Sequence, residues 1–232
     1  MSRRLLLRSL DFHQKGYRPL QFGFFKTSNV ELWNMFKAWF AISLAFGIVL
    51  GGVSLKLPVS FLLSAFTVGI GFLLHEAAHK VTAQRLGYPA EFRSMDEMLF
   101  LAVMMSFLGF VFAAPGATMI FARVLDINKN GKISIAGPLV NLILAGVFLL
   151  GLVFLSPSFL FLKELLRLDF HLILESLPLR YALPLLGIKI NGWLALFNML
   201  PFWLFDGKKV WAWNKFIYGL VVLLAIMVVF VV

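Results

Sequence analysis

The sequence predicts an all-α polytopic membrane protein with five to six transmembrane helices. Of its 232 residues, 61% are apolar and 14% are charged, and the mean hydropathy is +0.91, well above that of a soluble domain. Several apolar runs approach the roughly 20 residues that a helix needs to cross a hydrocarbon core of about 30 Å. The basic residues behind the net charge of +10 are scattered between these runs, as positive-inside loops would be, so the expected partner is the lipid bilayer and not nucleic acid.

The chain divides into a short N-terminal segment and one membrane domain. Residues 1–32 begin with basic residues but contain no uninterrupted apolar core and no small-residue cleavage site, which disfavours a signal peptide. We expect them to lie in the cytoplasm or at the interface. Residues 33–232 form the integral membrane domain, with its core at 58–207.

The first span is predicted at about 33–53. Ser28 and Glu31 have the spacing of a capping box just before it. Within the span, Gly47 and Gly51 form a GxxxG pattern, which indicates close packing against another helix.

The second span begins near Pro58, a residue suited to the first turn of a helix, and continues to about Leu86. Residues 98–114 are apolar but short, and they run into a Pro-Gly pair. We expect them to form a membrane re-entrant segment, with short strands near 88–95 and 117–134.

Residues 126–137 resemble the first half of an EF-hand loop, but Gly137 stands where a bidentate glutamate would be needed. This disfavours calcium and favours a polar turn at Asn130-Gly131 between short strands. A further span is expected at about 133–155. Residues 156–189 mix charges with leucines and predict an amphipathic interfacial segment, followed by spans at about 190–205 and 210–232.

A polar motif interrupts the second span. His75 and His79 are four residues apart, so on a helix they lie on one face, with Glu76 beside them. This HExxH arrangement can hold Zn²⁺ through two imidazoles, while the glutamate removes a proton from the zinc-bound water. The chain has no cysteine, so any further metal ligand must be His, Asp or Glu.

A catalytic zinc needs a third protein ligand. Asp206 is the other acid inside an uncharged apolar run, and intramembrane acids are functional by default. A downstream glutamate such as Glu164 or Glu175 would be the third ligand if the chain were a protease of the gluzincin type.

Three segments together resemble a known family. HEAAH at 75–79, AGPLVN at 136–141 and N-x-x-P-x-x-x-x-D-G at 198–207 resemble, in order, the signatures of the site-2 protease family of intramembrane zinc metalloproteases. The resemblance extends over about 60–215, and the layout looks like that of a compact archaeal or bacterial member.

The resemblance implies the role of each residue in these segments. His75, His79 and Asp206 would hold one zinc ion per chain, and Glu76 would be the general base. Asn198 would hold the substrate backbone, and Pro201 would break its helix and free carbonyl groups for an extended substrate. The substrate-binding residues are expected to be Asn198, Pro201, Gly137, Pro138 and Asn141.

The topology determines where this site faces. Counting along straight helices puts His75 about 25 Å from the start of its helix and Asp206 about 23 Å along its own, so the two helices must run parallel. That requires an odd number of crossings between them, which the span at 133–155 supplies if residues 98–114 dip in and return. Lys and Arg then concentrate on the cytoplasmic side with the zinc.

The expected function is an intramembrane zinc metalloprotease that hydrolyses peptide bonds within transmembrane segments of membrane proteins, with a zinc water activated by Glu76 as nucleophile. The alternative is a non-enzymatic metal-binding membrane protein or transporter. The sequence shows no inverted repeat and no further midplane charges, which argues against a transporter. The oligomeric state is left open.

Overall fold

The computed structural model describes residues 18–23, 25–111, 115–168 and 172–230. Parts of four predicted segments lie outside the described residues, namely 1–17 with 24, 112–114, 169–171 and 231–232. The described chain is mostly helical, with two small antiparallel sheets. The elements are β1 (Pro19–Phe22), β2 (Phe25–Ser28), α2 (Asn29–Gly51), α3 (Leu57–Ser64), the π-helical turn η1 (Ala65–Gly69), α4 (Ile70–Arg85), β3 (Ala90–Ser94), α5 (Asp96–Ser106), β4 (Gly116–Ile120), α6 (Ile127–Leu155), α7 (Phe159–Leu166), α8 (Ile173–Ser176), α9 (Leu179–Asn198), α10 (Asp206–Trp213) and α11 (Lys215–Phe230).

Three helical stretches are long and apolar enough to cross a membrane. They are Asn29–Gly51, Leu57–Arg85 and Ile127–Leu155, and Lys215–Phe230 is a shorter apolar helix. These helices indicate a membrane-embedded protein. The count of five to six spans stays a prediction.

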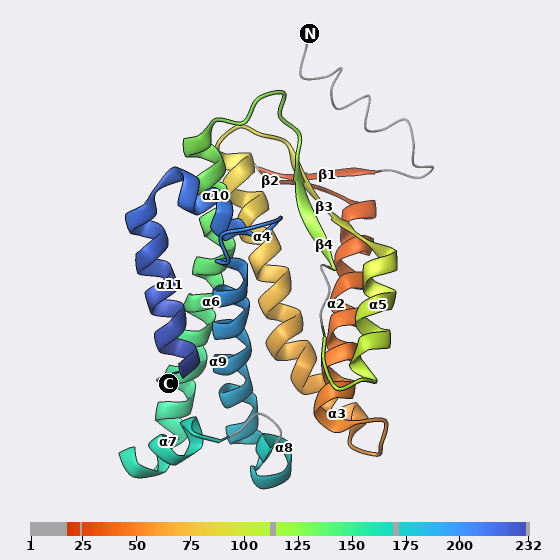
Figure 1. Ribbon diagram of the computed structural model, residues 1–232. Coiled ribbons are helices and arrows are strands. Elements are labelled where there is room, and N and C mark those ends of the chain that lie inside the picture. Colours follow the sequence, from red (N-terminus) through yellow and green to blue (C-terminus); the bar gives the residue numbers. More distant parts are fainter. Residues whose placement is uncertain (1–17, 24, 112–114, 169–171, 231–232) are drawn as a thin grey trace.

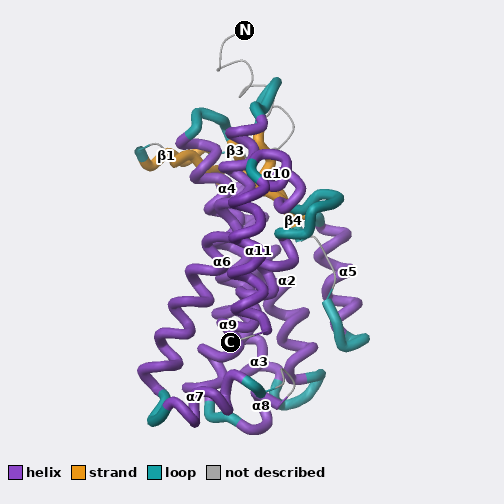
Figure 2. Tube along the Cα trace, turned by 60° about the vertical axis from the view of Figure 1, so that its left-hand side comes forward, coloured by secondary structure: helices purple, strands orange, loops and turns teal. Residues whose placement is uncertain are grey.

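The long helices lie side by side, and α6 packs most extensively against α9 and α4. Both sheets and α10 lie at one end of the molecule, and α3, α7 and α8 lie at the other (Figure 1). α5 lies at the edge in both views (Figures 1 and 2). The α4–α6–α9 unit therefore forms the scaffold on which any site at the strand end is built.

The start of α2 follows the predicted cap. Ser28 is the N-cap and accepts a hydrogen bond from the Glu31 backbone N–H at 3.1 Å. The predicted close packing is confirmed as well, because a Cβ at Gly47 would lie 2.9 Å from the Phe61 Cα, and one at Gly51 would overlap the Ser60 side chain.

α3, η1 and α4 form one continuous helix with a single π-turn. The Trp39 indole N–H donates to the Ala65 carbonyl at 3.2 Å, so this carbonyl serves a partner outside its own helix. A π-turn changes the rotational phase of the residues after it. The sequence pattern did not predict this turn, which ends six residues before His75.

The stretch between β3 and β4 starts and ends at the same place, because the two strands pair antiparallel, with Ser94 opposite Gly116 and Ala90 opposite Ile120. The 11 residues of α5 extend only about 16 Å, too short to cross a membrane. The strand pairing agrees with a segment that returns to the end where it started, and the membrane re-entry of residues 98–114 stays a prediction.

The predicted strand at 117–134 is only partly right. β4 ends at Ile120, and α6 already begins at Ile127, so Asn130 and Gly131 form helix and not a turn. Contacts from α10 explain the early start: the Trp213 indole N–H donates to the Asn128 side chain at 2.8 Å, and a Cβ at Gly131 would overlap the Trp213 side chain.

The boundary predicted near residue 190 is wrong. α9 begins at Leu179, directly after Pro178, and ends at Asn198. Its charged Arg180 is exposed, while the opposite face is buried, so the mixed composition reflects an amphipathic packed helix. The helix break expected at Pro201 is confirmed, and Asp206 therefore starts α10 and does not extend α9.

Candidate metal centre

α4 turns its polar motif into the protein. His75, Glu76 and His79 are all buried, although their helix is apolar enough to be a candidate membrane span. The i, i+4 spacing places both imidazoles on one face, where their ring centroids are 4.6 Å apart.

Three candidate ligand atoms meet at one point. The Nε2 atoms of His75 and His79 are 3.0 Å apart. Oδ2 of Asp206 lies 3.4 Å from the first and 2.9 Å from the second. Ligands around a tetrahedral zinc at about 2.0–2.2 Å are separated by about 3.3–3.6 Å, so this triangle matches zinc within a few tenths of an ångström.

The outer ring nitrogens explain why these atoms need a cation. His75 Nδ1 lies 2.6 Å from the Asn141 side-chain oxygen, and His79 Nδ1 lies 2.8 Å from the Ile133 carbonyl oxygen. The Ile133 carbonyl oxygen can only accept. The Asn141 oxygen also accepts, because the amide nitrogen of that side chain donates to the Gly71 carbonyl and to Asn191. Each Nδ1 therefore carries the proton, and two Nε2 lone pairs face each other beside a carboxylate. A metal ion relieves this repulsion, and such partners are typical of metal-binding histidines.

Gly137 of α6 leaves room at the same point. A Cβ at this position would lie 2.5 Å from Nε2 of both histidines. Any side chain there would occupy the space between the candidate ligands. This is the physical reason for a glycine in the AGPLVN segment.

Asp206 is held by its local chain. It lies in the first turn of α10, where the helix dipole stabilises a carboxylate. Its second oxygen, Oδ1, lies 3.3 Å from the Lys209 ammonium. A Cβ at Gly207 would overlap the Met199 carbonyl, so only glycine lets α10 approach the end of α9 this closely.

Glu76 is adjacent to the ligands but does not belong to their triangle. Its Oε2 accepts hydrogen bonds from the backbone N–H and the hydroxyl of Thr118, each at 2.8 Å. A strand from a distant part of the chain thus holds the predicted base.

The five predicted substrate-binding residues lie in different environments. Gly137 and Pro138 are buried in α6, and Asn141 is buried behind His75. The Asn198 amide donates to the Leu194 carbonyl of its own helix at 2.8 Å, and Pro201 is exposed in the following loop.

The sequence did not predict which residues contact the candidate ligands. Asn141, expected to bind substrate, contacts His75, and Ile133 contacts His79 through its backbone carbonyl. Thr118 and Lys209 carry no sequence signal beyond the i, i+3 spacing of Lys209 from Asp206. The alternative ligands Glu164 and Glu175 lie on α7 and α8, at the opposite end of the helices from α10 (Figure 1).

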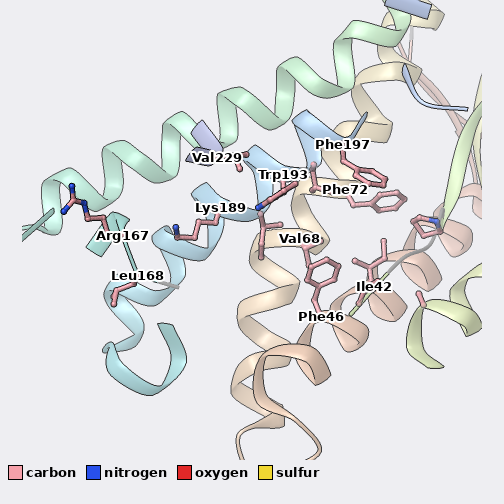
Figure 3. A pocket seen from close by; sticks show the side chains of 15 residues that line it. Ile42, Phe46, Val68, Phe72, Arg167, Leu168, Lys189, Trp193, Phe197 and Val229 are labelled. Carbon is pink, nitrogen blue, oxygen red and sulfur yellow. The ribbon is translucent and has the colours of Figure 1, made fainter. Parts of the chain in front are cut away.

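A cavity of about 540 Å³ extends along α9 beside the site. Most of its lining is apolar, with side chains from α2, α4 and α9 (Figure 3). Phe72, three residues before His75, and Phe197, next to Asn198, line one part of it. Arg167 and Lys189 line another part.

Comparison with known proteins agrees with this donor set. No family model and no solved structure matches the chain. The chain is 38% identical, over 162 residues, to a Methanocaldococcus jannaschii protein named "Putative zinc metalloprotease MJ0611", and the match covers 69% of this chain and 75% of the relative. The chain therefore belongs to the zinc metalloprotease family that this archaeal protein represents.

Proposed function

We propose that the protein is an intramembrane zinc metalloprotease of the site-2 protease type, which cleaves peptide bonds within transmembrane segments of other membrane proteins. The observation that carries the proposal is the convergence of two histidines and one aspartate beside a buried glutamate, on a helix apolar enough to span a membrane. Ionisable residues in a membrane-spanning helix are rare and usually mark a functional site.

The residues divide the chemistry between them. His75, His79 and Asp206 hold the zinc, which when bound polarises the substrate carbonyl and makes water more acidic. Glu76 accepts the proton of the attacking water and delivers it to the leaving nitrogen. Gly137 keeps the space between the ligands open.

The substrate is an apolar segment that has lost its helical hydrogen bonds. A helix hides its peptide bonds, so the segment must unwind before cleavage. The break between α9 and α10 places non-helical backbone near Asp206, and the apolar cavity along α9 offers a place for the side chains of the segment. In our proposal α9 and α11 also cross the membrane, and the site faces the cytoplasmic side.

The test is proteolysis by purified protein. Zinc-loaded wild type and Glu76→Gln are incubated in detergent or vesicles with a panel of single-span membrane proteins, and the products are identified by mass spectrometry. We expect the wild type to cut within a transmembrane segment. We expect Glu76→Gln to retain about one zinc per chain and to lose about 10²–10⁴-fold in turnover, the range that a general base supplies.

The matched control is Glu164→Gln, on α7 at the other end of the molecule, which should cleave at the wild-type rate. Wild-type turnover by metal-replete Glu76→Gln would contradict the proposed mechanism. If zinc-loaded wild type cleaves no transmembrane substrate, a non-enzymatic metal-binding role becomes the better explanation.

A further inference from the structure

Glu76 is held on one side only. The Thr118 N–H and hydroxyl both lie 2.8 Å from Oε2, and the hydroxyl also lies 3.1 Å from the Glu76 carbonyl oxygen. Among the residues that the structure describes, the hydrogen bonds to this carboxylate all end on Oε2. Oε1 is therefore the oxygen left to accept a proton.

Thr118 is itself fixed in place. In the β3–β4 ladder it lies opposite Phe92, whose backbone N–H donates to Oε1 of Glu31 at 2.9 Å. The other oxygen of Glu31 accepts from the Lys80 ammonium at 2.5 Å. Lys80 lies one helical turn after Glu76 on α4.

These contacts close a ring that starts and ends on α4. One side is Glu76 with Thr118, and the other is Lys80 with Glu31 and Phe92. A shift of the two-strand ladder along α4 would break at least one side, because both carboxylates are buried and bind backbone N–H groups. The strand therefore has one register relative to Glu76.

We propose that Thr118 is a positioning residue for the general base. Its two donors fix Oε2, so the carboxylate cannot rotate and Oε1 keeps one orientation toward the reacting water. Catalytic groups need their rotamers locked by neighbouring residues to within a few tenths of an ångström. Because both donors of Thr118 are directed at Glu76, we expect its effect on turnover and not on substrate binding. The inference rests on the proposed function.

The first test compares Thr118→Val, which removes the hydroxyl at equal shape, with Thr118→Ser, which keeps it. Zinc-loaded Thr118→Val should lose about tenfold in kcat, a part of the 10²–10⁴ that the base supplies, with KM and zinc content unchanged. Thr118→Ser should recover most of that loss. Thr67→Val is the matched control, because Thr67 is a buried threonine that bonds only its own helix at Leu63.

The second test does not depend on activity. The exchange rate of the Thr118 backbone amide is measured in wild type, Glu76→Gln and Glu76→Ala. Gln still accepts the hydrogen bond, so exchange should stay slow, whereas Glu76→Ala should speed it at Thr118.

The outcomes separate the two proposals. If the wild type cleaves substrate and folded Thr118→Val has the wild-type kcat, the positioning role is wrong. Unchanged exchange at Thr118 in Glu76→Ala would also overturn it. If the wild type cleaves nothing, the proposed function fails and the positioning role fails with it, while the exchange experiment still decides the Thr118–Glu76 contact.

Discussion

Two buried polar clusters share one turn of α4 and differ in how their charges are satisfied. At Lys80 the ammonium meets the Glu31 carboxylate, which also accepts hydrogen bonds from Thr27 and Phe92. At His75 and His79, two ring lone pairs and the Asp206 carboxylate face one another. The first cluster is complete within the protein. The second brings the ligand atoms of three side chains to one point, where they could hold a metal ion.

This difference separates a structural cluster from a functional one. Burial alone does not, since Lys80 and Glu31 are as deeply buried as the histidines. Buried polar groups are normally paired with a donor or an acceptor of the protein, and Glu31 follows that rule. The Nε2 atoms of the two histidines and Oδ2 of Asp206 do not follow this rule, because three acceptors lie next to one another. A cation bound between them would remove the repulsion. Trp203, three residues before Asp206, has the one positive φ (51°) among the described non-glycine residues.

Removing one residue from each cluster should give the largest contrast. His79→Ala removes a ligand, so purified protein should lose its zinc entirely, and Asp206→Ala and His75→Ala should do the same. Lys80→Met changes the next residue along the chain but no ligand, so its folded fraction should keep about one zinc per chain. Metal analysis of the purified variants measures both. Full zinc in Asp206→Ala would remove that residue from the site.

The Lys80 cluster should instead respond in folding stability. Lys80→Met leaves the Glu31 carboxylate buried without its cation, and loss of one partner of a buried pair costs about 3–5 kcal/mol. The double variant Glu31→Gln with Lys80→Met is neutral, and the glutamine can still accept from Phe92. It should recover most of the loss.

Denaturant unfolding in detergent, with zinc held constant, measures these free energies. Lys37→Met is the matched control, because the Lys37–Asp96 pair is partly exposed and such pairs contribute about 0–1 kcal/mol. If the double variant is no more stable than Lys80→Met, the two side chains are not an energetic pair.

The comparison also shows what the sequence could predict. The two histidines were predicted because metal binding from one helix face requires a four-residue spacing, and Asp206 was predicted from its place in an apolar run and from the family resemblance at 198–207. The membrane class and the cap at Ser28 were predicted from composition and local rules. Each of these signals lies within a short stretch of chain.

The features of the fold and the site that the sequence did not predict depend on contacts between distant segments. Lys80 resembles a helix-end lysine, and nothing nearby indicates that its partner is 49 residues away. Thr118 meets Glu76 only because β3 fixes the register of β4. The early start of α6 depends on Trp213, and the early start of α9 depends on a buried face that its charges conceal. The path of the chain to Asp206 also differs from the straight helix expected, because a helix break precedes this residue.

The smallest of these expected effects tests whether the metal cluster extends beyond its ligands. Asn141 is fully buried and links three helices: it accepts from His75 of α4, and its amide donates to Asn191 of α9 at 3.0 Å. Asn141→Ala keeps all three ligands but frees the His75 ring to rotate and to change its protonated nitrogen. Loss of such a partner weakens metal binding by about 10–100-fold, which competition with a chelator would measure.

Asn34→Ala is the matched control. It removes another buried asparagine, one that bonds Val30 and Ser94 away from the ligands, and it should leave zinc affinity unchanged. Equal affinity in the two variants would limit the metal cluster to its three ligands, whereas a selective loss in Asn141→Ala would mean that the packing of α4, α6 and α9 sets the strength of zinc binding.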